Sequence, residues 1–313
     1  MKRHLPVQLF TIFFVLSIIG TIMHFDMIDR PFFEQQYMLH QKIVEHSAPA
    51  PYQYRVLQPF LVDTILHLLS AKYGTNTYSL LFMGSYALIR FYAILITFIA
   101  VFLALRMKYA QGTAGFGVTL LAVFIPFTYR YYYYQPTSIL EMAFFALGLL
   151  MTLKRKAALL LPLVAIGTLN RETMCFIPLI YFMYWLPNLK RMEYVWLGVT
   201  SITFILIFMG LRIVWPAAGS LLDIFHYVSV NLTSSRDNLD LLLILSPLFI
   251  LFFNVKQMSA SSLRLALCSF PWLILHFFTS QWYEIRYYMP MLIWLLPGLM
   301  NVLVLEEIPI EIL

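Results

Sequence analysis

The stretch LLFMGSYALIRFYAILITFIAVFLAL, residues 80–105, decides the fold class, because it carries one charged residue in an otherwise apolar run. A helix needs about 20 apolar residues to cross a bilayer, and this run is longer than that. Arg90 lies about 15 Å from the end at residue 80, at a rise of 1.5 Å per residue. A charge at this depth is expected to face the interior of a helix bundle and to pair with a carboxylate or a carbonyl. The stretch therefore predicts a membrane-spanning helix with one buried arginine.

The composition of the whole chain indicates the same class. Of 313 residues, 61% are hydrophobic and only 12% are charged, and the mean hydropathy is +0.78. A soluble domain normally carries about 25% charged residues, and no polar stretch here is long enough to build a soluble core. Cys175 and Cys268 lie inside apolar runs, so the sequence predicts neither a disulfide framework nor a zinc site. We expect a single all-α transmembrane domain, residues 1–313.

Nine further apolar runs bring the expected number of spans to about ten. These runs lie at about 5–23, 115–128, 138–153, 157–169, 173–187, 194–214, 240–254, 265–279 and 290–305. The first follows a basic start but is not followed by a small-x-small cleavage site, so it is expected to be a retained helix. With both termini in the cytoplasm, every basic cluster falls on the cytoplasmic face, as the positive-inside rule requires. These clusters are Lys2/Arg3, Arg106/Lys108, Lys154/Arg155/Lys156, Lys190/Arg191 and Lys256/Arg264.

The long outer loop at 24–79 contains a short apolar segment at about 56–70. At about 15 residues it is short for a span, and a span here would move every downstream basic cluster to the outer face. Its polar residues recur at helical spacing, which is typical of an amphipathic helix in the membrane interface. We therefore expect an interfacial helix in this loop.

Two aspartates stand at the start of this loop, in HFDMIDRPFFEQQY. The spacing of Asp26 and Asp29 would bring both carboxylates to one side of a helical turn. Such a pair suits a divalent ion, magnesium or manganese, or a general base. The alternative is the solvated start of a loop.

Arg55 lies between aromatic residues in the stretch PYQYRVLQPFL, next to Tyr54. A guanidinium matches a phosphate with two parallel hydrogen bonds, which indicates a phosphate of a lipid headgroup. The alternative is an interface anchor, because tyrosine belts and snorkelling arginines are ordinary features of membrane proteins.

Further charges stand close to the ends of apolar runs. Ser138 and Glu141 have the spacing of a capping box, and Asn170 has the position of a helix N-cap. Arg171 and Glu172 point about 100° apart on a helix, so at least one of them needs another partner. Charges at this depth are candidates for a functional site. Arg286, in EIRYYMPML, belongs to the same outer face. Arg130 and the tyrosines 131–134 form either an aromatic wall of a sugar site or an interfacial belt.

Together these features resemble the C-type superfamily of membrane glycosyltransferases. Within that group, PYQYRVLQPFL, LNRETMCFIPL and EIRYYMPML are similar to three motifs of a bacterial multi-span family. The resemblance extends from about residue 7 to 305. It implies an enzyme of the bacterial cytoplasmic membrane that transfers a sugar from a polyprenyl-phosphate donor to an acceptor hydroxyl on the outer face. The family's first-loop acid, a base or metal ligand, corresponds to Asp26 or Asp29, although the family usually has a Gly-Tyr-Asp-Gly-Gln-like run there.

The residues themselves suit this chemistry. Sugar transfer from a lipid phosphate needs a carboxylate that takes the acceptor proton and positive charge that stabilises the departing phosphate. Asp26, Asp29 and Glu172 are the candidates for the first task, and Arg55, Arg171, Arg286, Glu141 and Tyr54 are the candidates for binding the substrate and its phosphate. The expected partners are membrane lipids and the lipid-linked donor, not nucleic acid. A transporter or flippase of lipid-linked glycans, or a non-catalytic assembly partner, would use the same basic groups without chemistry.

Overall fold

Helices account for the secondary structure of the part of the chain that the computed structural model describes, which is residues 5–73, 78–129, 136–220, 224–233, 238–281 and 284–304. No strand occurs within these ranges, so the all-α prediction is confirmed for them. The first helices are α1 (Val7–His24), α2 (Phe33–Val44), α3 (Leu57–Tyr73), α4 (Tyr78–Leu105), α5 (Gln111–Phe124), α6 (Ser138–Leu153) and α7 (Leu160–Thr168). The others are α8 (Phe176–Trp185), α9 (Arg191–Val214), α10 (Ile224–Thr233), α11 (Asn238–Phe253), α12 (Ala260–Leu267), α13 (Ser269–Thr279) and α14 (Met289–Val304).

Within the described residues, five helical segments are long and apolar enough to cross a membrane. They are Val7–Asp29, Tyr78–Leu105, Gln111–Tyr129, Arg191–Val214 and Ala260–Thr279. The helices of the other predicted runs are shorter than a span, so helix length confirms a membrane protein but not the number of ten spans. Lys2, Arg3, Arg130 and the tyrosines 131–134 lie outside the described residues.

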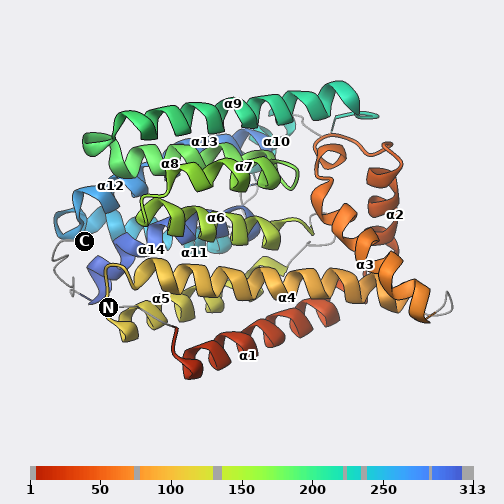
Figure 1. The fold of residues 1–313 in the computed structure, drawn as a ribbon, viewed down its shortest axis with the longest axis horizontal. Coiled ribbons are helices and arrows are strands. Elements are labelled where there is room, and N and C mark those ends of the chain that lie inside the picture. The colour runs from red at the N-terminus through yellow and green to blue at the C-terminus, as the bar shows by residue number, and fades with distance from the viewer. Residues whose placement is uncertain are drawn as a thin grey trace.

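The centre of the bundle is formed by α4, α6 and α14. Helix α4 packs against α1, α3, α5 and α6, and α14 packs against α6, α11 and α12 (Figure 1). Helix α9 lies at the edge of the bundle and exposes large apolar side chains along its length, among them Ile202, Leu206 and Ile213. An exposed apolar surface of this size is expected where a helix faces lipid.

The loops that carry the predicted cytoplasmic charges meet at one end of the bundle. Lys108 Nζ donates to Ser261 Oγ at 3.3 Å, and Arg264 Nε donates to the carbonyl oxygen of Met183 at 2.8 Å. Helices α2 and α3 lie at the opposite end (Figure 1). For the basic clusters of the described residues, the predicted separation from the long outer loop therefore agrees with the arrangement of the helices.

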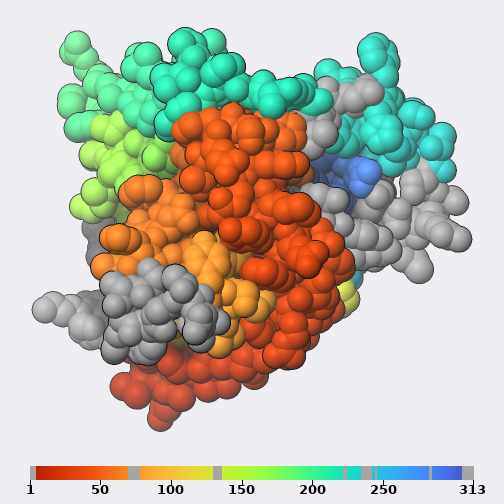
Figure 2. Space-filling view, turned by 90° about the vertical axis from the view of Figure 1, so that its right-hand side faces the viewer, coloured from red at the N-terminus to blue at the C-terminus, as the bar shows by residue number. Residues whose placement is uncertain are grey.

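The loop between α1 and α4 covers the end of the bundle that lies opposite the basic clusters. Figure 2 looks onto this end, where residues of the loop (orange) occupy the centre and α9 (green) lies along one edge. The predicted interfacial helix is present as α3, which packs against α4 through Val62 and Leu66 and exposes Phe60 and Leu68. Its position relative to lipid stays a prediction.

A buried histidine links three helices at this end. His40 on α2 bonds through Nε2 to the carboxylate of Asp63 on α3, at 2.9 Å, and through Nδ1 to the hydroxyl of Tyr86 on α4, at 3.0 Å. The tautomer that satisfies both bonds carries its proton on Nε2, because the Tyr86 hydroxyl can then donate to Nδ1. These bonds fix the loop on the end of the bundle, so residues 44–57 are held in a defined position.

The central arginine of the longest run pairs with a carboxylate, which is one of the two kinds of partner that its depth predicted. Arg90 Nη1 and Nη2 donate to the two carboxylate oxygens of Asp29, at 2.6 and 3.0 Å, and both side chains are buried. Asp29 is the last residue of a π-helical turn, Phe25–Asp29, that continues α1. Both oxygens of this carboxylate are therefore occupied by a guanidinium.

Candidate functional site

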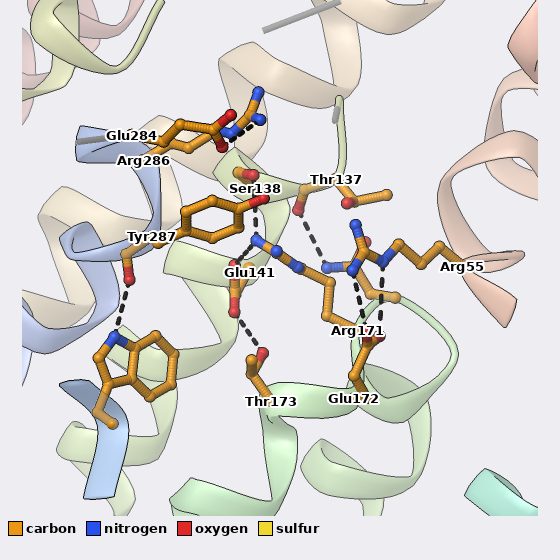
Figure 3. Close-up of polar contacts among 12 residues, drawn as sticks. Arg55, Thr137, Ser138, Glu141, Arg171, Glu172, Thr173, Glu284, Arg286 and Tyr287 are labelled. Carbon is orange, nitrogen blue, oxygen red and sulfur yellow. Dashed lines mark hydrogen bonds and ion pairs between the residues drawn. The ribbon is translucent and has the colours of Figure 1, made fainter. Parts of the chain in front are cut away.

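The site begins with an ion pair between two loops. Arg55 Nη2 donates to Glu172 Oε1 at 2.9 Å, and Nε donates to Oε2 at 3.5 Å (Figure 3). The two loops are joined next to this pair, because the backbone N–H of Leu57 donates to the carbonyl oxygen of Leu169 at 2.9 Å. The fold thus brings together Arg55 and Glu172, which lie more than a hundred residues apart in the sequence.

The arginine determines the charge of this glutamate. Burial by itself would raise the pKa of Glu172, but the charge of Arg55 and its hydrogen bonds outweigh that effect and lower the pKa to about 2. Glu172 therefore stays ionised at every pH at which the protein is expected to work. A carboxylate with so low a pKa is a weak proton acceptor.

A second ion pair lies beside the first and is more deeply buried. Arg171 Nη1 donates to Glu141 Oε2 and, at 3.1 Å, to the hydroxyl of Ser138, while the hydroxyl of Thr173 donates to Glu141 Oε1 (Figure 3). Both charged side chains are almost completely buried. The guanidinium also lies over the ring of Tyr287, 5.3 Å from its centroid. The prediction that at least one of the adjacent residues Arg171 and Glu172 needs another partner is confirmed, because each pairs with a different element.

Two capping predictions at this place are wrong. Helix α6 begins at Ser138, its N-cap is Thr137, and no side-chain hydrogen bond caps it. Glu141 is not available for a capping box because its oxygens bind Arg171 and Thr173. Asn170 does not cap a helix either, since its amide nitrogen donates to the carbonyl oxygen of Thr137 at 3.1 Å.

The last predicted arginine pairs locally. Arg286 Nη2 donates to the carboxylate of Glu284 at 2.5 Å, and both side chains are largely buried. In Figure 3 this pair and the Arg55–Glu172 pair lie on opposite sides of Arg171 and Glu141. Three arginines that the sequence singled out are therefore gathered in one region, each with its own carboxylate.

A cavity of about 500 Å³ opens beside these pairs. Its polar lining includes Tyr54, Arg55, Arg171, Glu172, Arg212, His276 and Tyr287, and its apolar lining includes Phe204, Phe208 and Leu275. The walls come from the loop before α3, the loop after α7, and α9, α10 and α13. Among the described residues that line it, Glu172 is the one carboxylate. This size and this mixture of apolar walls with a few convergent polar groups are typical of a small-molecule site.

Two of the lining residues were not predicted from the sequence. Arg212, in the last turn of α9, donates through Nη1 to the carbonyl oxygen of Phe208 and lies 4.2 Å from the ring centroid of Tyr54. No carboxylate of the described residues forms an ion pair with it. His276 on α13 is 4% exposed. Both residues stand inside apolar runs, and an ionisable residue in such a run is itself the signal of a functional site.

The two first-loop aspartates do not line this cavity, and they do not share a face. Asp29 is buried against Arg90, whereas Asp26 is 55% exposed and lies 3.4 Å from Arg30. The helical spacing failed here because a π turn holds more residues than an α turn, so three residues no longer return to the same side.

The two aspartates are not placed to hold one divalent ion together. Both oxygens of Asp29 accept hydrogen bonds from Arg90, so they are not open to a cation. Within the described ranges, no group of three or more His, Cys, Asp and Glu side chains is placed to hold a metal ion.

The fold and the site define a helical membrane protein with a charged cavity at one end of its bundle. Comparison of the chain with protein-family models, with curated proteins and with solved structures found no match.

Proposed function

We propose that this protein transfers a sugar from a polyprenyl-phosphate donor to an acceptor hydroxyl, and that the cavity beside Arg55 and Glu172 holds the donor. The observation that carries the proposal is the combination, in one cavity, of three guanidinium groups with an apolar wall. A lipid-linked sugar phosphate needs both, because its phosphate is anionic and its chain is apolar.

The charges around the cavity favour one negative charge on the ligand. Arg55 is balanced by Glu172, and Arg171 is balanced by Glu141, whereas Arg212 has no carboxylate partner among the described residues. One positive charge therefore remains at the cavity. The phosphodiester of a polyprenyl-phosphate sugar carries one negative charge, which matches this remainder.

The apolar wall gives the lipid chain a route to the cavity. Phe204 and Phe208 come from α9 and Leu275 comes from α13. Both helices also expose large apolar side chains on their outer surfaces, such as Leu206 and Ile274. A polyprenyl chain could thus stay in the bilayer while its phosphate lies at Arg212.

The proposed transfer takes place on the outer face, in a chain of about ten spans with both termini in the cytoplasm of a bacterium. The charge separation along the bundle supports this orientation. We expect an impermeant thiol reagent, added to whole cells, to label Glu34→Cys in α2 and not Lys154→Cys after α6. Labelling of the second variant and protection of the first would reverse the orientation.

The main experiment measures binding and transfer separately. The purified protein in lipid nanodiscs is titrated with undecaprenyl phosphate, and transfer is measured with radiolabelled undecaprenyl-phosphate sugars and glycerol as the acceptor. Arg212→Gln is expected to weaken binding of undecaprenyl phosphate about 10- to 100-fold, because a hydrogen-bonded charge contributes about 1.5–3 kcal/mol. Arg30→Gln, an exposed arginine outside the cavity, is the matched control.

The results of this experiment separate the classes of function. Binding that is lost in Arg212→Gln, together with transfer by the wild type, supports the transferase. Binding without transfer of any sugar would indicate a transporter or an assembly partner. No binding by the wild type would overturn the assignment of the cavity.

A further inference from the structure

His276 has an unusual hydrogen-bonding state for a buried side chain. It lines the cavity, and neither of its ring nitrogens has a hydrogen-bond partner among the described residues. Buried polar atoms are nearly always paired, because an unmade hydrogen bond costs the desolvation of the group. Two unpaired nitrogens on one ring, next to a cavity, therefore indicate a group that binds a ligand.

The ring is held in place by aromatic contacts rather than by hydrogen bonds. Its centroid lies 4.6 Å from that of Trp272 on the same helix and 4.9 Å from that of Tyr287. Trp272 is itself fixed, because its indole N–H donates to the carbonyl oxygen of Tyr287 at 2.9 Å. The imidazole is thus oriented in advance at the wall of the cavity.

The other candidate for a proton acceptor in the cavity is less suitable. Both carboxylate oxygens of Glu172 already accept hydrogen bonds from Arg55. A neutral imidazole offers one N–H donor and one lone pair. A hydroxyl group, which is both donor and acceptor, is a matching ligand.

We propose that His276 binds the acceptor hydroxyl and takes its proton during the transfer. This inference rests on the proposed function. As the acceptor oxygen forms its bond to the anomeric carbon, the hydroxyl proton moves to the free ring nitrogen. The bond from that carbon to the phosphate oxygen breaks, and the phosphate leaves with the electron pair beside Arg212. The imidazolium then returns its proton to water, so the step needs no other reactant.

The test compares turnover, binding of undecaprenyl phosphate and thermal unfolding in three proteins in nanodiscs: wild type, His276→Asn and His276→Ala. We expect both variants to lose about two to four orders of magnitude in turnover and to bind undecaprenyl phosphate within about threefold of the wild type. Added imidazole is expected to restore part of the turnover of His276→Ala, because it can occupy the space of the missing ring. His67→Asn, an exposed histidine on α3, is the control.

The possible results separate a failure of the role of His276 from a failure of the proposed function. Wild-type turnover in His276→Asn would overturn the role of His276 and leave the transferase intact. A loss that imidazole does not restore, or that accompanies a lower unfolding temperature, would assign His276 to packing and also overturn the inference. A wild type that binds no undecaprenyl phosphate would overturn the proposed function, and this inference with it.

Discussion

Replacing Arg171 by methionine is expected to lower the free energy of unfolding by about 3–5 kcal/mol, because Glu141 would then be a buried charge without a cation. The carboxylate would keep the hydrogen bond from Thr173 but lose the one from Arg171. Ser138 would lose the same donor. Denaturant unfolding in detergent micelles, followed by tryptophan fluorescence, measures the change.

The double variant Arg171→Met/Glu141→Gln tests the reason for this loss. Removing both charges avoids an uncompensated charge in the interior, so most of the lost stability should return. As a control, Arg30→Gln breaks the exposed pair with Asp26, and its effect should stay below about 1 kcal/mol. A loss below 1 kcal/mol in the single variant would show that Glu141 finds another partner or becomes protonated.

The features that composition and charge control were predictable from the sequence. Residues 80–105 belong to one long helix. Arg90 pairs with a carboxylate, because an isolated charge in an apolar interior is costly. The basic clusters of the described residues gather at one end of the bundle, as the positive-inside rule predicted. The predicted helix at about 56–70 is present as α3, because its apolar spacing is a local property.

The partners of individual charges were not predictable, because they depend on which loops meet. Nothing in the stretch around Arg55 indicates Glu172 as its partner, since the pair depends on the backbone bond between Leu57 and Leu169. The capping role predicted for Glu141 was wrong because local rules do not include Arg171. The missed residue His276 could have been found, since a histidine inside an apolar run is unusual in itself.

Exchange of the first-loop aspartates decides whether this membrane protein uses the acid that the family resemblance implies. Asp29→Asn is expected to destabilise the fold by about 3–5 kcal/mol, since Arg90 would lose its buried counter-charge. Asp26→Asn changes an exposed side chain, so both stability and turnover should stay close to the wild type. Thermal unfolding and sugar transfer, measured on the same samples, separate these effects.

The informative protein is the double variant Asp29→Asn/Arg90→Gln. It removes both charges of the buried pair, so it is expected to recover much of the stability that Asp29→Asn loses. If Asp29 only holds Arg90, the folded double variant should transfer sugar at nearly the wild-type rate. If Asp29 takes the acceptor proton, turnover should remain about two to four orders of magnitude lower in spite of the restored stability. That second result would place the reaction at the end of α1 and move it away from the cavity at Glu172 and His276.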